Sequence, residues 1–186
     1  NGEQANQPVW QVCVIDDISN FRVGIPSFAI IVCCMQNGKA EHSVILNPIN
    51  GDEFTASRGR GAQLNNRRIR TGNVNSLSDA IVGYTQPMGN NEAAFDQLQR
   101  LQRLMSKSFD LRNIGSNALS ICYVAADRFQ GALLSNVDEF ALNAAGLLAS
   151  EAGCLLSEVS GQPLLRAPAN LVVSNPRLLK ALLAKD

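Results

Sequence analysis

A nearly continuous apolar run over residues 27–36, SFAIIVCCMQ, constrains the fold more than any other segment of this chain. It is rich in residues that favour β-structure, and it is far shorter than the roughly 20 apolar residues that a membrane span needs, so it predicts a central strand. Asn37-Gly38 follows at once, and this dipeptide is typical of a two-residue hairpin turn. Residues 40–48 then predict the returning strand of an antiparallel meander.

Further turn residues continue this meander. Asn50-Gly51 marks a turn, residues 53–59 predict a strand, and residues 62–70 predict a small hairpin that turns at Asn65-Asn66. Five arginines lie in and beside this hairpin. These arginines are Arg58, Arg60, Arg67, Arg68 and Arg70. They fit a solvated hairpin, which we favour, or a surface that binds an anionic partner, either protein or RNA.

Helical periods and short apolar runs alternate after about residue 80, and this pattern predicts a layered α/β protein with a mixed sheet. The length of 186 residues fits one domain, with residues 1–90 as its meander part and 91–186 as its alternating part. The predicted strands are 80–85, 108–114, 131–135, 154–161 and 169–175, and the predicted helices are 91–108, 115–129, 138–153 and 176–185.

Local signals place the ends of these helices. Asn91 and Ser116 are predicted N-caps, Gly153 is a favoured residue just past a helix end, and Pro176 is predicted at the first position of the last helix. The helix over 91–108 has one apolar face, expected to be core or a dimer interface, formed by Ala94, Phe95, Leu98, Leu101, Leu104 and Met105.

Composition narrows the class of protein. Sixteen basic residues balance sixteen acidic ones, so net charge indicates neither a nucleic-acid nor a membrane partner. The five cysteines are odd in number, form no C-x-x-C pair and lie in apolar surroundings, which predicts reduced thiols in a cytoplasmic protein. Cys33 and Cys34 alternate across one strand and are expected in the core. The single histidine, His42, is expected at the surface or in a cross-strand pair, and not as a zinc ligand.

Two adjacent carboxylates, Asp16 and Asp17, follow a short apolar run over residues 12–15 that looks buried. Acidic residues at the end of such a strand can hold a metal ion, but they also serve as helix caps and turn residues. Both interpretations are open from these residues alone.

Several separate segments together resemble the inositol monophosphatase family of metal-dependent sugar phosphatases. These segments keep the family's order and spacing over essentially all 186 residues. The first contains Asn20-Phe21, Gly24, Pro26 and Phe28, and the others are residues 47–70, 114–131, 143–161 and 170–183. The resemblance implies a layered αβαβα sandwich with mixed and antiparallel sheets. In this chain the family's N-terminal segment is expected to be absent, and with it a pair of metal-binding glutamates. The implied chemistry is Mg²⁺-assisted hydrolysis of a phosphate monoester.

The resemblance also assigns site positions. The family's metal-binding aspartates fall on Cys13, Asp16 and Ala141, so Asp16 remains as a vestigial metal ligand at most. The family's proline, tryptophan and substrate-facing glutamate fall on Val14, Phe140 and a position at or near Leu134, while Asp138 and Glu139 lie out of register. The implied substrate-binding positions are Asp17, Ile18, Ser19, Gly115, Ser116 and Asn117.

These substitutions argue against catalysis. Mg²⁺ requires near-octahedral oxygen ligands, which the Cys13 thiol and Ala141 do not supply, and Ile18 lacks the hydroxyl that would position a water. Asp17, at the start of a helix that would face phosphate, is expected to cap that helix and to repel an anion. We therefore favour cap and turn roles for Asp16 and Asp17, with a weak surviving metal site as the alternative. No catalytic residue and no bound cofactor are expected.

Three functions remain open at this stage. The favoured one is an inactive family member acting through protein interaction, as a homo-oligomer, with a transcription-machinery partner implied by resemblance to the family's bacterial branch. The first alternative is a Mg²⁺-dependent inositol-phosphate or sugar-phosphate phosphatase with an altered site. The second is a binding module that holds a sugar-like ligand through residues 115–117.

Overall fold

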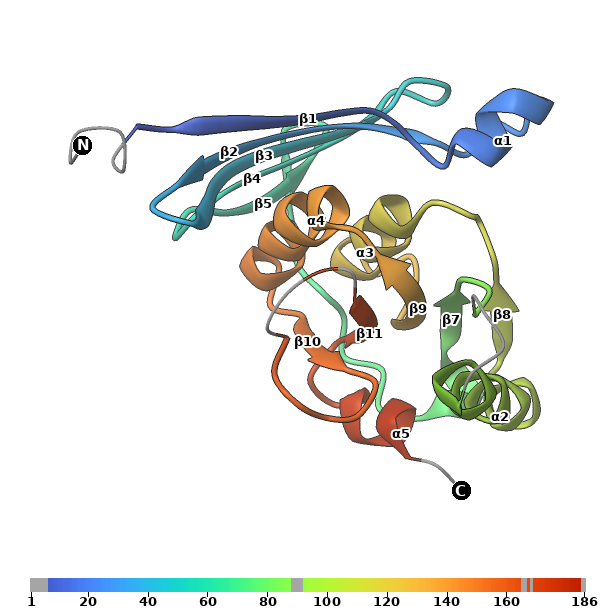
Figure 1. The fold of residues 1–186 in the computed structure, drawn as a ribbon. Helices are drawn as coiled ribbons and strands as arrows, with labels where there is room; N and C mark the ends of the chain where they lie inside the picture. The colour runs from blue at the N-terminus through green and yellow to red at the C-terminus, as the bar shows by residue number, and fades with distance from the viewer. Residues whose placement is uncertain (1–6, 88–91, 165–166, 168, 185–186) are drawn as a thin grey trace.

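The first half of the chain forms the predicted meander. The computed structural model describes residues 7–87, 92–164, 167 and 169–184. Strands at the N-terminal end pair in sequence order into a six-stranded antiparallel sheet (Figure 1). They are β1 (Val9–Asp16), β2 (Ala29–Gln36), β3 (Lys39–Asn47), β4 (Asp52–Ser57), β5 (Gly61–Leu64) and β6 (Arg67–Ile69).

The Asn37-Gly38 turn sets the register of this sheet. Both residues have positive φ, 51° and 73°, as a two-residue turn between twisted antiparallel strands requires. Gln36 therefore pairs with Lys39, and the pairing continues to Ile30 and Leu46.

A second, mixed sheet follows. Its strands lie in the order β10-β11-β9-β7-β8, and β7 pairs in parallel with both β8 and β9 while the other pairs are antiparallel. This confirms the mixed sheet that the sequence predicts. The strands are β7 (Ile81–Tyr84), β8 (Asp110–Arg112), β9 (Gly131–Val137), β10 (Leu155–Glu158) and β11 (Ala169–Ser174).

The helices form layers around the second sheet. α3 (Asn117–Ala125) and α4 (Glu139–Glu151) lie between the two sheets, whereas α2 (Glu92–Lys107) and α5 (Leu179–Leu183) lie on the far side of the second sheet (Figure 1). A short α1 (Ile18–Val23) follows β1, and a 3-10 turn, η2, spans Leu77–Asp79. The described layers thus run sheet, helices, sheet, helices, with no helical layer on the outer side of the first sheet. No helix of this described part is long and apolar enough to cross a membrane.

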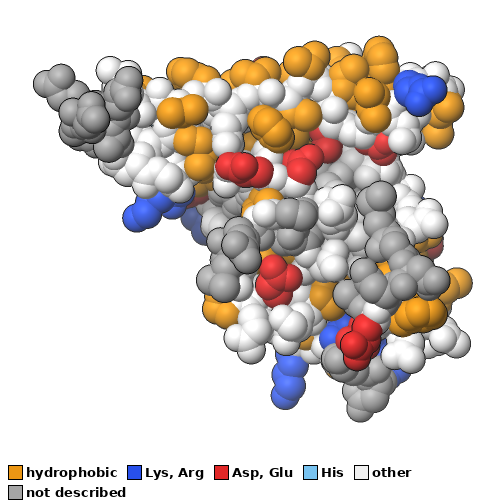
Figure 2. Space-filling model, in the orientation of Figure 1, with side chains coloured by type: hydrophobic (Ala, Val, Ile, Leu, Met, Phe, Trp, Pro, Cys, Tyr) orange, Lys and Arg blue, Asp and Glu red, His pale blue; other side chains and the backbone are white. Residues whose placement is uncertain are grey.

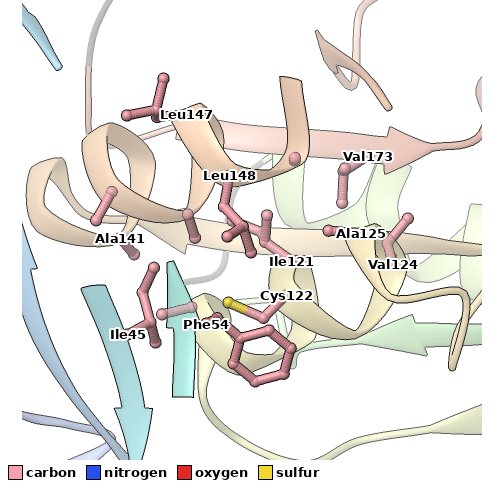
Figure 3. Close-up of a cluster of buried hydrophobic side chains, with 14 of the residues drawn as sticks. Ile45, Phe54, Ile121, Cys122, Val124, Ala125, Ala141, Leu147, Leu148 and Val173 are labelled. Atoms are coloured by element: carbon pink, nitrogen blue, oxygen red, sulfur yellow. The ribbon is translucent and has the colours of Figure 1, made fainter. Parts of the chain in front are cut away.

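The main core lies between the first sheet and α3 and α4. Figure 3 shows Ile45 and Phe54 of the sheet facing Ile121 and Cys122 of α3 and Leu148 of α4. All five side chains are fully buried, and burial of side chains of this size supplies most of the free energy that holds a sheet to its helices.

Several local predictions are confirmed. The Ser116 hydroxyl accepts a hydrogen bond from the backbone N–H of Leu119 and so caps α3, and Gly153 has a φ of +89° just past α4. His42 is exposed and its Nδ1 lies 2.9 Å from the Ser57 hydroxyl on the neighbouring strand. Cys33 and Cys34 are both buried, and the five cysteines are free thiols. The five arginines in and beside the hairpin are exposed, as expected for a solvated hairpin.

Two predictions are wrong. Residues 12–15 are not a buried run, because no described helix covers the outer face of the first sheet, where Val12 and Val14 are 52% and 68% exposed. The helix over 176–185 does not begin at Pro176. The Asn175 side chain instead accepts hydrogen bonds from the backbone of Arg177 and Leu178, which holds a turn, and α5 starts only at Leu179.

The apolar face of α2, expected as core or a dimer interface, divides in the structure. Ala94, Leu101 and Leu104 are buried, whereas Phe95, Leu98 and Met105 are exposed. Gln97 and Arg100 are buried in their place. Arg100 donates a hydrogen bond to the backbone oxygen of Ala184 (3.3 Å), and Arg103 donates to that of Ala181, so both arginines serve the end of α5. The predicted cap at Asn91 lies outside the described residues.

Candidate functional site

A cavity of about 1060 Å³ opens between α1 and the second sheet. Its floor includes Thr85 just after β7, Ser135 near the end of β9, and the loop that joins β8 to α3. β7, β8 and β9 run parallel, so their carboxyl ends meet here, which is the usual place for a ligand in an open α/β sheet.

Asp17 forms one wall of the cavity and caps α1. Its Oδ1 accepts a hydrogen bond from the backbone N–H of Asn20 at 3.0 Å, and its backbone has a left-handed φ of 69°. This confirms the predicted role of Asp17 as a helix cap. Its other oxygen lies against Gly115, so closely that a Cβ at position 115 would come within 1.8 Å of it. Gly115 therefore lets the Asp17 carboxylate approach the loop before α3.

Asp16 is directed into the protein and holds the start of α3. Its Oδ2 accepts hydrogen bonds from the Ser116 hydroxyl and from the backbone N–H of Ala118, the latter at 3.1 Å. Burial raises the pKa of the Asp16 carboxyl, although these two hydrogen bonds lower it in part. Both acidic residues at the end of β1 are thus engaged with helix N-termini.

The neighbouring positions offer little to a metal ion. Burial raises the pKa of the Cys13 thiol, and the nearby Asp16 raises it further, so Cys13 is a protonated and poor Mg²⁺ ligand. Ala141 is fully buried, and its backbone N–H donates to Asp138 Oδ1 at 2.8 Å, which makes Asp138 the cap of α4. The described residues contain no group of three or more His, Cys, Asp or Glu side chains arranged to hold a metal. Mg²⁺ therefore does not fit this site.

The remaining predicted positions divide into two groups. Ser19, Gly115 and Asn117 line the cavity together with Asp17. Ser116 is fully buried beside Asp16, and Ile18 is exposed but is not part of the cavity wall.

The other family positions also lie outside the cavity. Leu134 is buried in the main core, and Val14 and Phe140 are exposed. Glu139 accepts a hydrogen bond from the Gln11 side chain at 2.9 Å and thereby ties α4 to β1.

The sequence analysis missed most of the cavity lining. Thr85 and Ser135 join Asn117 in one network: the Thr85 hydroxyl donates to Asn117 Oδ1 (3.1 Å) and accepts from the Ser135 backbone N–H (2.8 Å). The Asn117 amide in turn donates to the Ser135 carbonyl oxygen at 3.2 Å. The available signal was a polar residue at the end of each of the predicted strands 80–85 and 131–135, because the carboxyl ends of parallel strands meet at one edge of a sheet.

The fold places this chain in the sugar-phosphatase class of layered α/β proteins. The chain belongs to the inositol monophosphatase family, whose model matches residues 1–186. This family is magnesium-dependent in general.

Bacterial SuhB proteins are among the relatives of this chain. The protein named Nus factor SuhB in Pseudomonas aeruginosa is 35% identical over 185 residues, which are 98% of this chain and 68% of that protein. Its namesake in Vibrio cholerae is 33% identical over 94% of this chain and 65% of its own length. The crystal structure of extragenic suppressor protein suhB from Bartonella henselae has a TM-score of 0.88 at 30% identity, covering 97% of this chain and 72% of that one. The chain spans about two thirds of the length of the two Nus factors.

Proposed function

We propose that this chain is a SuhB-like member of the inositol monophosphatase family that is catalytically inactive and acts through protein interaction. One observation carries the proposal: Asp16 and Asp17 hold the N-termini of α3 and α1. Carboxylates committed to these backbone groups are not free to organise a metal ion and its water.

The energetics support this interpretation. A buried Asp16 with a raised pKa resists the ionised form that a metal ligand requires. Moving it towards a metal would also leave the N–H of Ala118 and the hydroxyl of Ser116 without their acceptor, at about 1–3 kcal/mol for each buried group. The binding of Mg²⁺ to a single carboxylate does not offset that loss of free energy, because Mg²⁺ gives up its bound water reluctantly.

The partner is proposed from the relatives. Because those proteins are named Nus factors, we infer that this chain binds a component of the transcription machinery in the cytoplasm. We also propose that it self-associates through the outer face of the first sheet, where apolar side chains gather along β1 and α1 (Figure 2).

A phosphatase with an altered site is the second candidate. It is favoured by Asp16, which keeps its family position, and by the cavity beside Gly115, which has room for a sugar phosphate. In this case Asp16 would have to leave Ser116 when a metal binds.

Hydrolysis of inositol 1-phosphate separates the two candidates. With millimolar Mg²⁺ we expect no phosphate release above that of an Asp16→Ala variant, and no effect of Li⁺. Calorimetric titration should likewise detect no tight Mg²⁺ or Mn²⁺ site. Release that EDTA abolishes, or a micromolar metal site lost in Asp16→Ala, would establish the phosphatase instead.

A fourfold variant tests the proposal further. The variant Cys13→Asp, Asp17→Gly, Ile18→Thr, Ala141→Asp restores four family positions, and we expect it to remain inactive unless the family's N-terminal segment, with its pair of metal-binding glutamates, is also supplied. Losing one preorganised electrostatic element commonly costs about 10²–10³ in rate, and such losses act as a unit. Binding to a purified transcription complex should be unchanged in Asp16→Ala, provided that this variant keeps its circular dichroism spectrum.

A further inference from the structure

A second, smaller cavity of about 240 Å³ lies between α2 and the turn that follows β10. Gln97 and Arg100 of α2 line it, together with Glu158 and Ser160 from the end of β10 and its turn. It shares no described lining residue with the cavity beside α1, so the two are separate sites.

The α2 wall of this smaller cavity carries hydrogen-bond donors that lack an acceptor. Gln97 and Arg100 are each only 2% exposed, yet Gln97 Nε2 and Arg100 Nε have no hydrogen-bond partner in the described part of the chain. A buried donor without an acceptor lowers stability, and native proteins seldom keep one without a use. Because the two residues are three apart on a helix, their side chains are neighbours, and one oxygen-bearing group can accept from both.

The Arg100 side chain is fixed before any ligand arrives. Its Nη1 donates to the backbone oxygen of Leu183 and, at 3.3 Å, to that of Ala184, both at the end of α5. A guanidinium held in this way loses little further freedom when a ligand binds to its Nε, which favours binding of a small molecule with few contacts.

The wall across from α2 supplies a negative charge. Glu158 lines the cavity, and no cation of the described residues forms an ion pair with it. Burial raises the pKa of the Glu158 carboxyl, and an ammonium group beside it would lower that pKa by stabilising the charged form. Asp96 also lines the cavity, but its charge already acts on Arg100, four residues further along α2.

We propose that this cavity binds a small α-amino compound, in which neighbouring carbon atoms carry an ammonium group and a carbonyl or carboxylate oxygen. The oxygen accepts hydrogen bonds from Gln97 Nε2 and Arg100 Nε, and the ammonium group donates to the Glu158 carboxylate. Neither group is enough alone, because an amine leaves the buried donors unpaired and a carboxylate leaves Glu158 without a cation. The volume suits a molecule smaller than the usual ligands of protein pockets.

Nitrogen–proton NMR spectra of the labelled chain test the inference, because the Gln97 side-chain amide and the Arg100 Nε–H each give a signal. Titration with L-alanine should shift both signals. Two matched probes each lack one half of the recognised group: propionate has no ammonium group, and ethylamine has no oxygen. We expect each to bind at least about tenfold more weakly than L-alanine, because each loses a charge-assisted hydrogen bond.

L-alaninamide distinguishes two sources of the same chemistry. It keeps the ammonium group and the carbonyl oxygen but has no carboxylate. Tighter binding of L-alanine assigns the site to a free amino acid, whereas tighter binding of L-alaninamide assigns it to an amide or the N-terminus of a peptide.

Two variants separate the halves of the site. Gln97→Met should weaken L-alanine binding by at least about tenfold without lowering the Tm, because it removes a buried donor that is unpaired in the free protein. Glu158→Gln should weaken the binding of L-alanine and ethylamine but leave that of propionate unchanged. Glu53→Gln is the matched control: Glu53 is an exposed glutamate of β4 that does not line the cavity, so its substitution should change nothing.

Equal binding of L-alanine and propionate overturns the inference, as does the absence of any shift of the two signals at L-alanine concentrations on the order of tens of millimolar. Unchanged L-alanine binding in Glu158→Gln overturns it too, and this variant is informative even if Gln97→Met fails to fold, since Glu158 is only half-buried. The inference is independent of the proposed function, because neither a metal nor the cavity beside α1 takes part.

Discussion

The two faces of the six-stranded sheet carry similar side chains and meet opposite environments. On the inner face Ile31, Cys33 and Ile45 are buried against α3 and α4. On the outer face Val12, Val32 and Val44 lie side by side on three neighbouring strands, and Val12 and Val44 remain exposed. The strands are equally β-forming on both sides, so burial here depends on what packs against each face and not on strand propensity.

The outer face is itself divided. The row that begins with Val12, Val32 and Val44 continues across β4 to β6 with polar residues, Thr55, Gln63 and Arg68. Exposed side chains of α1, Phe21 and Val23 among them, extend the apolar half beyond the sheet. An apolar half bordered by a polar half is the pattern of an interaction surface with one edge defined.

Neighbouring residues on β3 give the largest expected difference between the faces. Ile45→Ala should lower the free energy of unfolding by about 2–5 kcal/mol, because it leaves a cavity in the core. Val44→Ala, one residue earlier and on the outer face, should lower it by no more than about 1 kcal/mol. Urea unfolding of both variants at low protein concentration measures the difference. Equal losses would mean that the outer face is covered within the single chain.

Charge on the outer face should control self-association. At concentrations on the order of tens of micromolar, light scattering should report a dimer or larger species for the unmodified chain. Val12→Lys should convert it to monomer, because a lysine would be desolvated at the interface. Thr55→Lys lies in the same row of the sheet but in its polar half, and should leave the mass unchanged. A monomeric mass for the unmodified chain would refute self-association through this face.

The smallest and most specific effect on stability is expected at Asp16, the buried last residue of β1. Its carboxyl pKa is raised in the folded state, so the folded protein binds more protons than the unfolded one above the unfolded value of about 3.9. The stability contributed by this group is present at lower pH and is lost as pH rises through the folded pKa.

Asp16→Asn should remove this dependence, because the amide oxygen can still accept hydrogen bonds from Ser116 and Ala118 but does not titrate. Unfolding free energies of the two proteins, measured at a series of pH values from acid to neutral, should diverge in favour of the variant as pH rises. Parallel curves would show that Asp16 keeps an ordinary pKa.

Local chemistry was enough to predict much of the fold. Asn37-Gly38 specified a two-residue turn, Ser116 a helix start and Gly153 a helix end, because each of these depends on the backbone of a few adjacent residues. The capping role of Asp17 was expected instead from the family resemblance, which places the start of a helix at this position.

The cavity was less predictable. Thr85 and Ser135 are 50 residues apart in the chain and meet only when β7 and β9 pair. Asp16 and Ser116 are 100 residues apart, and nothing near Asp16 in sequence indicates that its acceptor capacity is spent on α3. Family position identified Gly115 and Asn117 but could not show that the Asp17 carboxylate lies against that loop.

The sequence by itself determined the turns, the start of α3, the end of α4 and the mixed α/β class, because these are properties of residue type and near neighbours. Tertiary structure alone decided which apolar residues are buried. Val12 lies in a run that looks buried in sequence, and Phe95 lies on the apolar face of its helix, yet both are exposed, whereas Arg100 is buried. Periodicity shows that a strand or helix has an apolar face, but only the packing of distant elements determines whether water is excluded from it.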